Sequence, residues 1–537
     1  MRRLLSILIP LTLALTLRLY PTLSSGLPFS TDAWPILRNT ELLSKLTPVD
    51  LGDEKVFDGY NSYWPANTIF GVILSRISGL DTIHSMSLGV PLSSALAIPI
   101  FYALLEALTG DRSLALTASI ILASSYPYSI LTAGVTKETY ASPIYILLIL
   151  VYLYRRGSLY ARLILVALSS LALASAHHLT SIVSLTILSC ISIAELYEWV
   201  VGGVYPRLER PVYTMVYAAI LGLYFWLYAY RGVRIEISFG DIASAVSYQI
   251  VALTFSLYVY RRPILGYRMG AAALSTVAAM VTALAAFIPT VKQITPGLPR
   301  LPRYYIVYAI PFITASQIAV IGFRYTRRYT WRIIPLLWLS SIIGLEAYSI
   351  FGGHPIGSTL AYRMLNFLWP PLSILVASGL EAVYRSIYDA KSRSAAAKAA
   401  IAAYMIILVS SNLYDYYASI NLRERYMGYF WLYTPYEYSS IRYLDSSIGE
   451  LPISCDVKMS YLAGGYLGID VDTIQGFRYL SGLSNVKPKT LLVYRDMLSI
   501  GYILYGGYSV YLGGSALGRL ESLSMVYSNR EAWIYVP

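Results

Sequence analysis

The stretch Gly26-Leu-Pro-Phe-Ser-Thr-Asp-Ala-Trp-Pro-Ile-Leu-Arg38 begins where the first long apolar segment of the chain, residues 4–27, comes to its end. That segment is long enough to cross a bilayer as a helix. Residues 35–46 then repeat apolar side chains at helical spacing, and Pro35 suits the first turn of a helix. The pattern predicts a membrane span that leads into a helix lying along the membrane surface.

Asp32 is the first acidic residue of the chain and stands at the mouth of this predicted span. A carboxylate at that place suits a general base or a metal ligand acting on a membrane-borne substrate. The plainer alternative is that Asp32 caps the surface helix. The rest of the chain has to decide between these two interpretations.

The composition excludes an ordinary soluble protein. Of the 537 residues 56% are hydrophobic and 13% are charged, which is about half the charged fraction of soluble domains. The mean hydropathy is +0.56, so a polytopic membrane protein is expected. The opening Met1-Arg-Arg-Leu-Leu resembles a signal peptide, but no small-residue cleavage site precedes Asp32, and we expect a retained signal-anchor.

The net charge of +12 would suit a nucleic-acid partner. The basic residues lie mostly between the apolar segments, however, so membrane orientation explains them better and no nucleic-acid partner is expected. Of the two cysteines, Cys190 lies inside an apolar segment and Cys455 in the polar tail, and together they cannot build a disulfide framework.

Thirteen apolar segments can be marked as membrane spans. After the first, they lie at about residues 84–107, 113–132, 140–154, 162–178, 180–201, 211–230, 244–260, 269–290, 304–323, 332–351, 363–384 and 398–417. Most have close to the roughly 20 residues that a span requires, and 140–154 is the shortest.

The basic residues between these spans are unevenly distributed. With the N-terminus inside, the inner segments hold nineteen Lys and Arg residues and the short outer loops hold seven. Because cytoplasmic loops carry the excess of positive charge, the N-terminus is expected in the cytoplasm and the C-terminus outside the cell membrane.

The composition changes near residue 418. Residues 418–537 contain no apolar run of span length, and short β-type stretches such as Leu491–Tyr494 and Ser509–Leu512 alternate with Gly-Gly turns. We therefore predict a transmembrane domain over residues 1–417, with a long first outer loop at 28–81, and a small extracytoplasmic α/β domain over 418–537.

Several polar groups gather on the predicted outer face. Between the third and fourth spans, Lys137 and Glu138 stand together at the mouth of a membrane helix, either as a functional pair or as a solvated loop pair. His177 and His178 make up half of the four histidines in the chain. Adjacent residues on a helix point about 100° apart, so substrate contact or interhelical hydrogen bonding is favoured over a shared metal ion.

Glu346 lies in the outer part of a predicted span, where an ionisable side chain is a functional candidate because its burial is costly. A structural ion pair with Arg363 is the alternative. Arg363 and Arg303 lie at the outer ends of spans, and guanidinium groups suit bidentate phosphate binding, although an arginine at a span end can also simply snorkel.

Carboxylates and cations on one side of the membrane are what glycosyl transfer from a lipid-phosphate sugar requires. A base deprotonates the acceptor while negative charge develops on the departing phosphate. The chain contains no P-loop, GxGxxG, HExxH, GxSxG or CxxC motif, so soluble-cofactor chemistry has no support.

The layout resembles the GT-C glycosyltransferases, which include the catalytic subunit of oligosaccharyltransferase, the protein O-mannosyltransferases and many archaeal relatives. The resemblance rests on the thirteen spans, on Asp32 and Glu138 in two outer loops, and on the outer tail domain. The run Tyr60-Asn-Ser-Tyr-Trp-Pro-Ala-Asn67 also looks like archaeal members. The resemblance implies that Asp32 and Glu138 are catalytic and that a polyprenyl-phosphate donor binds in an outward-facing groove of the membrane protein.

The chain also departs from this family. The WWDYG motif of oligosaccharyltransferases is absent, and Lys137 stands beside Glu138 where that branch has paired acids. A cation in place of a metal ligand suggests that Lys137 neutralises phosphate directly, so we expect no cofactor and doubt a metal dependence. We therefore do not expect an oligosaccharyltransferase, but a broader glycosyltransferase with an acceptor that the sequence does not identify.

Two other interpretations compete with the enzyme. A lipid-glycan flippase would need polar residues through the membrane midplane, and the middles of the predicted spans are nearly free of charge. A degenerate GT-C relative that acts as an assembly scaffold is the third interpretation.

Overall fold

The computed structural model describes the chain at residues 2–46, 50–53, 56–154, 157–203, 208–233, 238–261, 270–293, 300–326, 330–354, 357–388, 394–447, 452–504 and 508–537. Ten of the basic residues counted for membrane orientation lie outside the described residues: Arg155, Arg156, Arg207, Arg234, Arg262, Arg268, Arg327, Arg328, Lys391 and Arg393.

The chain divides into two compact units. Unit 1 comprises Met1–Leu17, Ser93–Thr132 and Ala141–Tyr416, and unit 2 comprises Arg18–Leu92, Ala133–Tyr140 and Tyr417–Pro537. Unit 2 thus joins the predicted first outer loop, the predicted second loop and the C-terminal tail.

Ten helical segments among the described residues are long and apolar enough to cross a membrane, which makes the chain a multi-pass membrane protein. They are formed by α1 (Arg2–Ser25), α4 (Thr82–Ala95) with α5 (Ala97–Thr109), α9 (Leu159–Ala176), α10 (His178–Gly202), α12 (Phe239–Arg261), α13 (Ala271–Val291), η3 (Arg303–Ala309) with α14 (Ile310–Tyr325), α15 (Ile333–Phe351), α16 (Gly357–Tyr388) and α17 (Ser394–Ile420).

Three further predicted spans coincide with helices that are not among these ten. They are α6 (Arg112–Ser124) with α7 (Tyr126–Leu131), then α8 (Lys137–Leu153) and α11 (Glu209–Leu227). The helices α6 and α8 are only 13 and 17 residues long, so the predicted number of thirteen spans is not confirmed.

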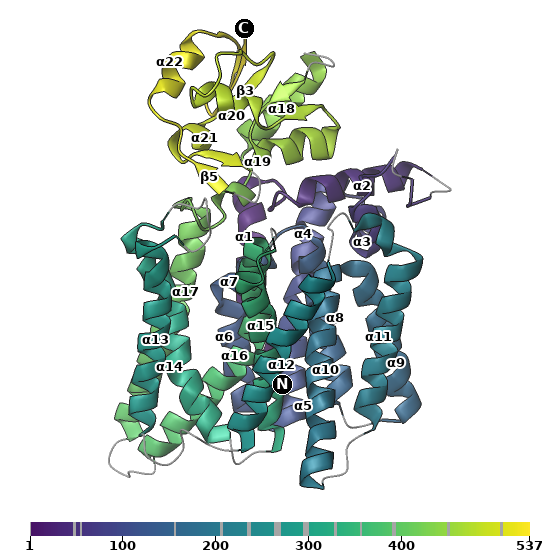
Figure 1. The fold of residues 1–537 in the computed structure, drawn as a ribbon, viewed down its shortest axis with the longest axis vertical. Helices are drawn as coiled ribbons and strands as arrows, with labels where there is room; N and C mark the ends of the chain where they lie inside the picture. The colour runs from purple at the N-terminus through teal and green to yellow at the C-terminus, as the bar shows by residue number, and fades with distance from the viewer. Residues whose placement is uncertain are drawn as a thin grey trace. The chain divides into compact units, whose positions relative to one another are not determined.

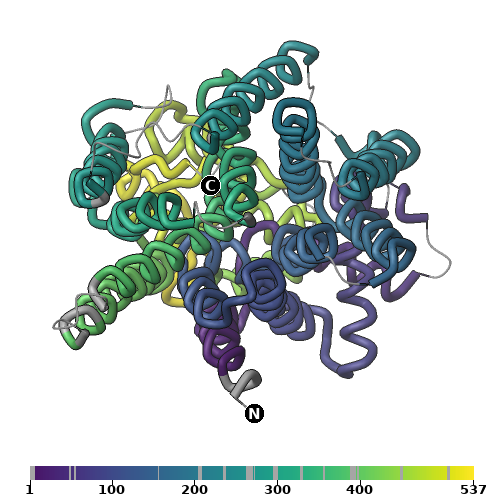
Figure 2. The backbone as a smooth tube through the Cα atoms, turned by 90° about the horizontal axis from the view of Figure 1, so that it is seen from below, coloured from purple at the N-terminus to yellow at the C-terminus, as the bar shows by residue number. Residues whose placement is uncertain are grey.

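The helices of unit 1 pack side by side, and several are seen end on in Figure 2. Among the described residues, α14 and α16 approach each other closely at Gly322 and Gly379. A Cβ atom at Gly322 would lie 1.8 Å from the carbonyl oxygen of Leu375, and one at Gly379 would lie 2.2 Å from that of Ile318. Because lipid provides no hydrophobic force between helices, such close approach of small residues contributes to their association.

The N-terminal part of unit 2 contains α2 (Ala33–Lys45), η1 (Asn61–Tyr63) and α3 (Ala66–Ser78). The predicted surface helix is therefore present as α2 and begins two residues before Pro35. The helices α2 and α3 pack closely, because a Cβ atom at Gly71 would lie 2.9 Å from the Thr40 side chain and 2.6 Å from the sulfur of Met86.

The tail forms the predicted α/β domain. Its five-stranded sheet has the order β2 (Val471–Asp472), β1 (Ile453–Ser454), β3 (Leu491–Tyr494), β7 (Ala532–Val536), β6 (Ser524–Ser528). The pairs β1–β2 and β1–β3 are parallel, whereas β3–β7 and β6–β7 are antiparallel. The predicted strand at Leu491–Tyr494 is β3, and the second lies next to its prediction as β5 (Tyr508–Val510), which pairs with β4 (Tyr502–Leu504).

Five helices, α18 (Pro435–Ser447), α19 (Val457–Ser460), α20 (Gln475–Leu480), α21 (Arg495–Ser499) and α22 (Ser515–Glu521), complete this domain (Figure 1). A short π-helix, η7 (Tyr461–Leu467), follows α19 and packs against α2.

Trp34 of α2 is the centre of this contact. It is fully buried, and its ring lies 5.1 Å from that of Tyr433, 5.8 Å from Tyr438 and 5.5 Å from Tyr466. Further along α2, the guanidinium of Arg38 donates to the carbonyl oxygen of Gly464 at 3.4 Å. The hydroxyl of Tyr466 also donates to Glu41 at 2.7 Å. The tail therefore holds the helix that follows Asp32.

The predicted orientation can be checked by cysteine labelling of intact cells. We expect Leu483→Cys, at a position that is 72% exposed in the tail, to react with an impermeant maleimide. The background should be low because both native cysteines are buried. Ser158→Cys, an exposed position in a predicted inner loop, should react only after the cells are opened. The opposite labelling pattern would overturn the N-inside topology.

Candidate functional site

Asp32 stands at the N-cap position of α2, as the plainer interpretation of this residue predicted. Its side chain, however, makes no capping hydrogen bond to the helix. The carboxylate is half-buried at the N-terminus of α2, where the helix dipole favours negative charge. The position of Asp32 therefore suits a carboxylate, with or without a catalytic role.

A sharp bend precedes Asp32. Ser30 is a buried non-glycine residue with a φ of 90°, a conformation that L-residues rarely adopt. Its amide donates to the carbonyl oxygen of Trp431 at 2.9 Å, and its hydroxyl accepts from the amide of Asp32 at 3.3 Å. These bonds hold the strained turn, and such strain concentrates at functional sites.

The second outer loop is joined to this bend. The amide of Val135 donates to the carbonyl oxygen of Phe29 at 3.1 Å. A Cβ atom at Gly134 would lie 2.9 Å from both that oxygen and the Cβ of Ser30, so only glycine allows this approach. The two loops that carry the predicted acids therefore meet within unit 2.

Lys137 and Glu138 follow at once, in the first turn of α8. The hydroxyl of Thr136 caps this helix by accepting from the amide of Thr139 at 3.0 Å. Lys137 is 7% exposed and Glu138 only 3%, so a solvated loop pair is not what the structure contains. Glu138 lies where the helix dipole stabilises a carboxylate.

The ammonium of Lys137 lies against two aromatic rings. Its Nζ atom is 3.7 Å from the centre of the Tyr60 ring and 4.9 Å from that of Trp64. Both rings belong to the run 60–67, which had been noted for its resemblance to archaeal proteins. The sequence assigned no role to them, because nothing local connects this run with residue 137.

The histidines predicted as a site belong to unit 1. His177 is the N-cap of α10 and His178 its first residue, so they do not share one helix as the sequence suggested. The Nδ1 atom of His177 lies 2.7 Å from the hydroxyl of Thr180, and the two imidazole rings are 5.0 Å apart at 66°. Hydrogen bonding is one of the two roles that the sequence suggested for these histidines, and His177 makes such a bond at a helix junction.

The other three candidates also lie in unit 1. Glu346 is half-buried in α15, and its Oε2 atom has no hydrogen-bond partner among the described residues. Arg363 is half-buried near the start of α16, where its guanidinium lies 5.8 Å from the ring of Tyr362. Arg303 is exposed at the first residue of η3.

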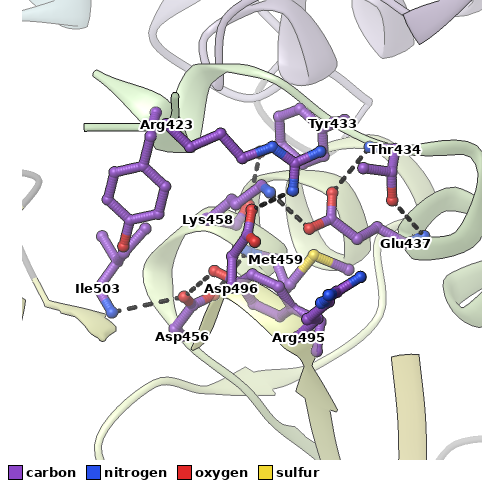
Figure 3. A network of polar contacts seen from close by, with 12 residues as sticks. Arg423, Tyr433, Thr434, Glu437, Asp456, Lys458, Met459, Arg495, Asp496 and Ile503 are labelled. Atoms are coloured by element: carbon purple, nitrogen blue, oxygen red, sulfur yellow. Dashed lines mark hydrogen bonds and ion pairs between the residues drawn. The ribbon is translucent and has the colours of Figure 1, made fainter. Parts of the chain in front are cut away.

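A buried polar network fills the tail domain next to Tyr433 (Figure 3). The ammonium of Lys458 donates to Glu437 at 2.6 Å, and both residues are almost entirely buried. Glu437 also accepts a hydrogen bond from the amide of Thr434 at 2.9 Å, just before the first residue of α18. Burial raises the pKa of Glu437, and the Lys458 ammonium opposes that rise. The hydroxyl of Tyr433 donates to the carbonyl oxygen of Lys458 at 2.6 Å, which connects the network with Trp34.

The second carboxylate of the network is Asp456. It accepts from the hydroxyl of Tyr494 at 2.5 Å and from the amide of Met459 at 3.0 Å. Burial raises the pKa of Asp456 to about 6, against the lowering effect of these hydrogen bonds. Nearby, Arg423 and Asp496 form an ion pair of 2.7 Å. Asp456 and Lys458 are fully enclosed by protein, which indicates a structural role for these two residues.

The fold of this chain is similar to that of two solved archaeal oligosaccharyltransferase structures. The archaeal oligosaccharyltransferase AglB from Archaeoglobus fulgidus, solved with an inhibitory peptide and a dolichol-phosphate, matches 92% of this chain and 69% of its own. The TM-score is 0.58 and the sequence identity 12%. A crystal structure of an A. fulgidus oligosaccharyltransferase with zinc and sulfate covers 99% of this chain and 73% of its own, with a TM-score of 0.56 and 12% identity.

These two likenesses show that the chain has the GT-C fold. ArnT from Cupriavidus metallidurans, bound to undecaprenyl phosphate, covers 98% of this chain and 97% of its own at 12% identity, but its TM-score of 0.38 carries no argument. A scan against protein-family models and a search of curated proteins gave no match.

The zinc in one of these neighbours raises the question of a metal site in this chain. Among the residues that the structure describes, no group of three or more His, Cys, Asp or Glu side chains is placed to hold a metal ion. The second loop, moreover, offers Lys137 next to Glu138.

Proposed function

We propose that this chain is a glycosyltransferase that moves a sugar from a polyprenyl-phosphate-linked donor to an acceptor on the outer face of the membrane. The observation that carries the proposal is the junction of the first two outer loops. The Phe29–Val135 hydrogen bond and the close approach of Gly134 to Ser30 bring the loop of Asp32 to the loop of Lys137 and Glu138.

In the proposed reaction Asp32 takes a proton from the nucleophilic group of the acceptor. The acceptor atom then attacks the anomeric carbon of the donor sugar, and the bond between that carbon and the phosphate oxygen breaks. Lys137 stabilises the negative charge that develops on the departing phosphate, as a fixed cation can. Glu138 assists as the second carboxylate and orients the acceptor.

The unit 1 candidates are proposed to bind the donor. Arg363 and Arg303 carry guanidinium groups, which form bidentate hydrogen bonds with phosphate. His177, His178 and Glu346 are proposed to contact the sugar or the phosphate. The neighbour AglB was solved with a dolichol-phosphate, which supports a lipid-phosphate donor for this chain.

The direct test is sugar transfer by the purified protein. We expect radiolabelled sugar to pass from an isolated polyprenyl-phosphate donor to an acceptor extract of the host membrane, in detergent or in vesicles. Donor translocation across the vesicle membrane without transfer would support the flippase interpretation. Neither transfer nor translocation would favour a scaffold.

We expect turnover to survive metal chelation, because Lys137 can supply the positive charge that a metal ion supplies elsewhere. Transfer should keep its rate in excess EDTA, with a known metal-dependent glycosyltransferase losing its activity under the same conditions. Loss of transfer in EDTA, with recovery on adding Mn²⁺ or Mg²⁺, would contradict this expectation and recast Glu138 as a ligand.

A further inference from the structure

Tyr60 and Trp64, in the run 60–67, form an aromatic wall beside the Lys137 ammonium. They have no role in the proposed reaction as described above. A lysine side chain has a flexible four-carbon stem, so an ammonium at the start of a helix has no fixed place of its own. In this structure its Nζ atom lies over the ring faces of Tyr60 and Trp64, and the side chain is nearly enclosed. An ammonium within about 6 Å of a ring centre is attracted by the negative face of the ring.

The two rings are themselves held in place. A carboxylate oxygen of Asp58 accepts from the amides of Tyr60 at 3.0 Å and Asn61 at 2.7 Å. The amide of Trp64 then donates to the carbonyl oxygen of Asn61 at 3.1 Å and closes the 3-10 turn. As a result the two ring centres lie 5.3 Å apart at an angle of 57°, and Trp64 is 1% exposed.

The wall is also tied to the helix that carries Lys137. Phe70, in α3, packs its ring 5.1 Å from that of Tyr140, which lies three residues after Lys137 in α8. The start of α8 and the run 60–67 therefore have a fixed relation at two points, the ammonium and the Phe70–Tyr140 contact.

Aromatic faces differ from carboxylates in one respect that matters for this site. They attract an ammonium without cancelling its charge, because the ring has a quadrupole and no net charge. A lysine in contact with such rings is held at a defined place.

We infer that Tyr60 and Trp64 are positioning residues, which hold the Lys137 ammonium where the donor phosphate departs. This inference rests on the proposed glycosyl transfer. The aromatic pair then acts through Lys137 and touches neither the sugar nor the acceptor.

The positioning can be measured without any substrate. Purified protein is acetylated with acetic anhydride, and the rate at each lysine is followed by mass spectrometry. We expect Lys137 to react slowly in the wild type and in Tyr60→Phe, which keeps the ring face. In Tyr60→Leu, which keeps bulk and removes the π face, the rate at Lys137 should rise roughly tenfold to thirtyfold, in line with the strength of a desolvated cation–π contact.

Two other lysines serve as internal standards. Lys489 is exposed and marks the fast limit, and Lys458 is fully buried and marks the slow limit. If Lys458 also becomes reactive in Tyr60→Leu, the variant has lost its fold, and Trp64→Phe against Trp64→Leu replaces it as the deciding pair. Equal rates at Lys137 in the wild type and in a folded leucine variant would overturn the inference.

The activity assay separates this inference from the proposed function. If both hold, the leucine variant loses about tenfold in kcat for sugar transfer, with an unchanged KM for the acceptor, and the phenylalanine variant restores it. If the labelling changes as expected but neither the wild type nor the variants transfer sugar, the positioning of Lys137 by the aromatic rings is supported and the proposed function is wrong. If the wild type transfers sugar and Tyr60→Leu changes neither labelling nor kcat, the function stands and the positioning role fails.

Discussion

Asp32→Asn should lower the rate of sugar transfer by about 10²–10⁴-fold, the contribution that a general base typically makes. The substitution keeps the size and shape of the side chain and removes its ability to accept a proton. The fold should survive, because the Asp32 side chain makes no capping hydrogen bond to α2. The measurement is the initial rate of transfer of labelled sugar from an isolated lipid-linked donor, at matched protein concentration.

Asp50→Asn is the matched control for this experiment. Asp50 is an exposed acid of the same outer loop, and its carboxylate accepts from the amide of Gly52 at 2.8 Å. Its substitution should change the transfer rate far less than that of Asp32. A wild-type rate in Asp32→Asn would mean that Asp32 is a surface charge, and the flippase and scaffold interpretations would then come before the enzyme.

Lys458→Met should destabilise the tail domain by about 3–5 kcal/mol, the cost of leaving one member of a buried ion pair without its partner. Glu437 would remain 2% exposed with its carboxylate facing a methionine in place of the ammonium. Pulse proteolysis of the full-length protein in increasing urea, read at fragments of the tail, gives the change in the free energy of unfolding.

The double variant Glu437→Gln with Lys458→Met tests the physical cause. Glutamine keeps an oxygen for the amide of Thr434 and carries no charge, so most of the lost stability should return. Lys489→Met, at an exposed position of the same domain, should have little effect. A loss of under about 1 kcal/mol in Lys458→Met, as an exposed ion pair would give, would show that Glu437 and Lys458 are not enclosed together.

The local parts of the fold could be predicted because they depend on local patterns. Length and hydropathy located the helices α1 and α10, and a short β-type stretch in a region of Gly-Gly turns located the strand at Leu491–Tyr494. The number of spans could not be predicted as well, because α6 and α8 are shorter than a bilayer requires when taken alone. Whether such a segment crosses a membrane depends on its neighbours more than on its own composition.

The acids of the proposed site could be named from the sequence, whereas the residues that surround them could not. An acid at the mouth of a span is visible in the sequence, so Asp32 and Glu138 could be named. The two loops that carry these acids come together only because Gly134 has no side chain and can approach Ser30 closely. The two residues are about a hundred positions apart in the sequence. No periodicity connects such positions. The one available signal for the partners of Lys137 was the aromatic run 60–67.

The packing of Trp34 has a consequence for the folding of the chain during its synthesis. Trp34 emerges from the ribosome early, whereas its partners Tyr433, Tyr438 and Tyr466 are made some four hundred residues later. At about 5–20 residues per second, roughly 20 to 90 seconds pass before the translating ribosome reaches Tyr466. During that interval the loop of Asp32 lacks the surface on which its helix rests. If the chain has the proposed activity, we expect no sugar transfer by a chain that ends before Tyr433, because its Asp32 loop lacks this support.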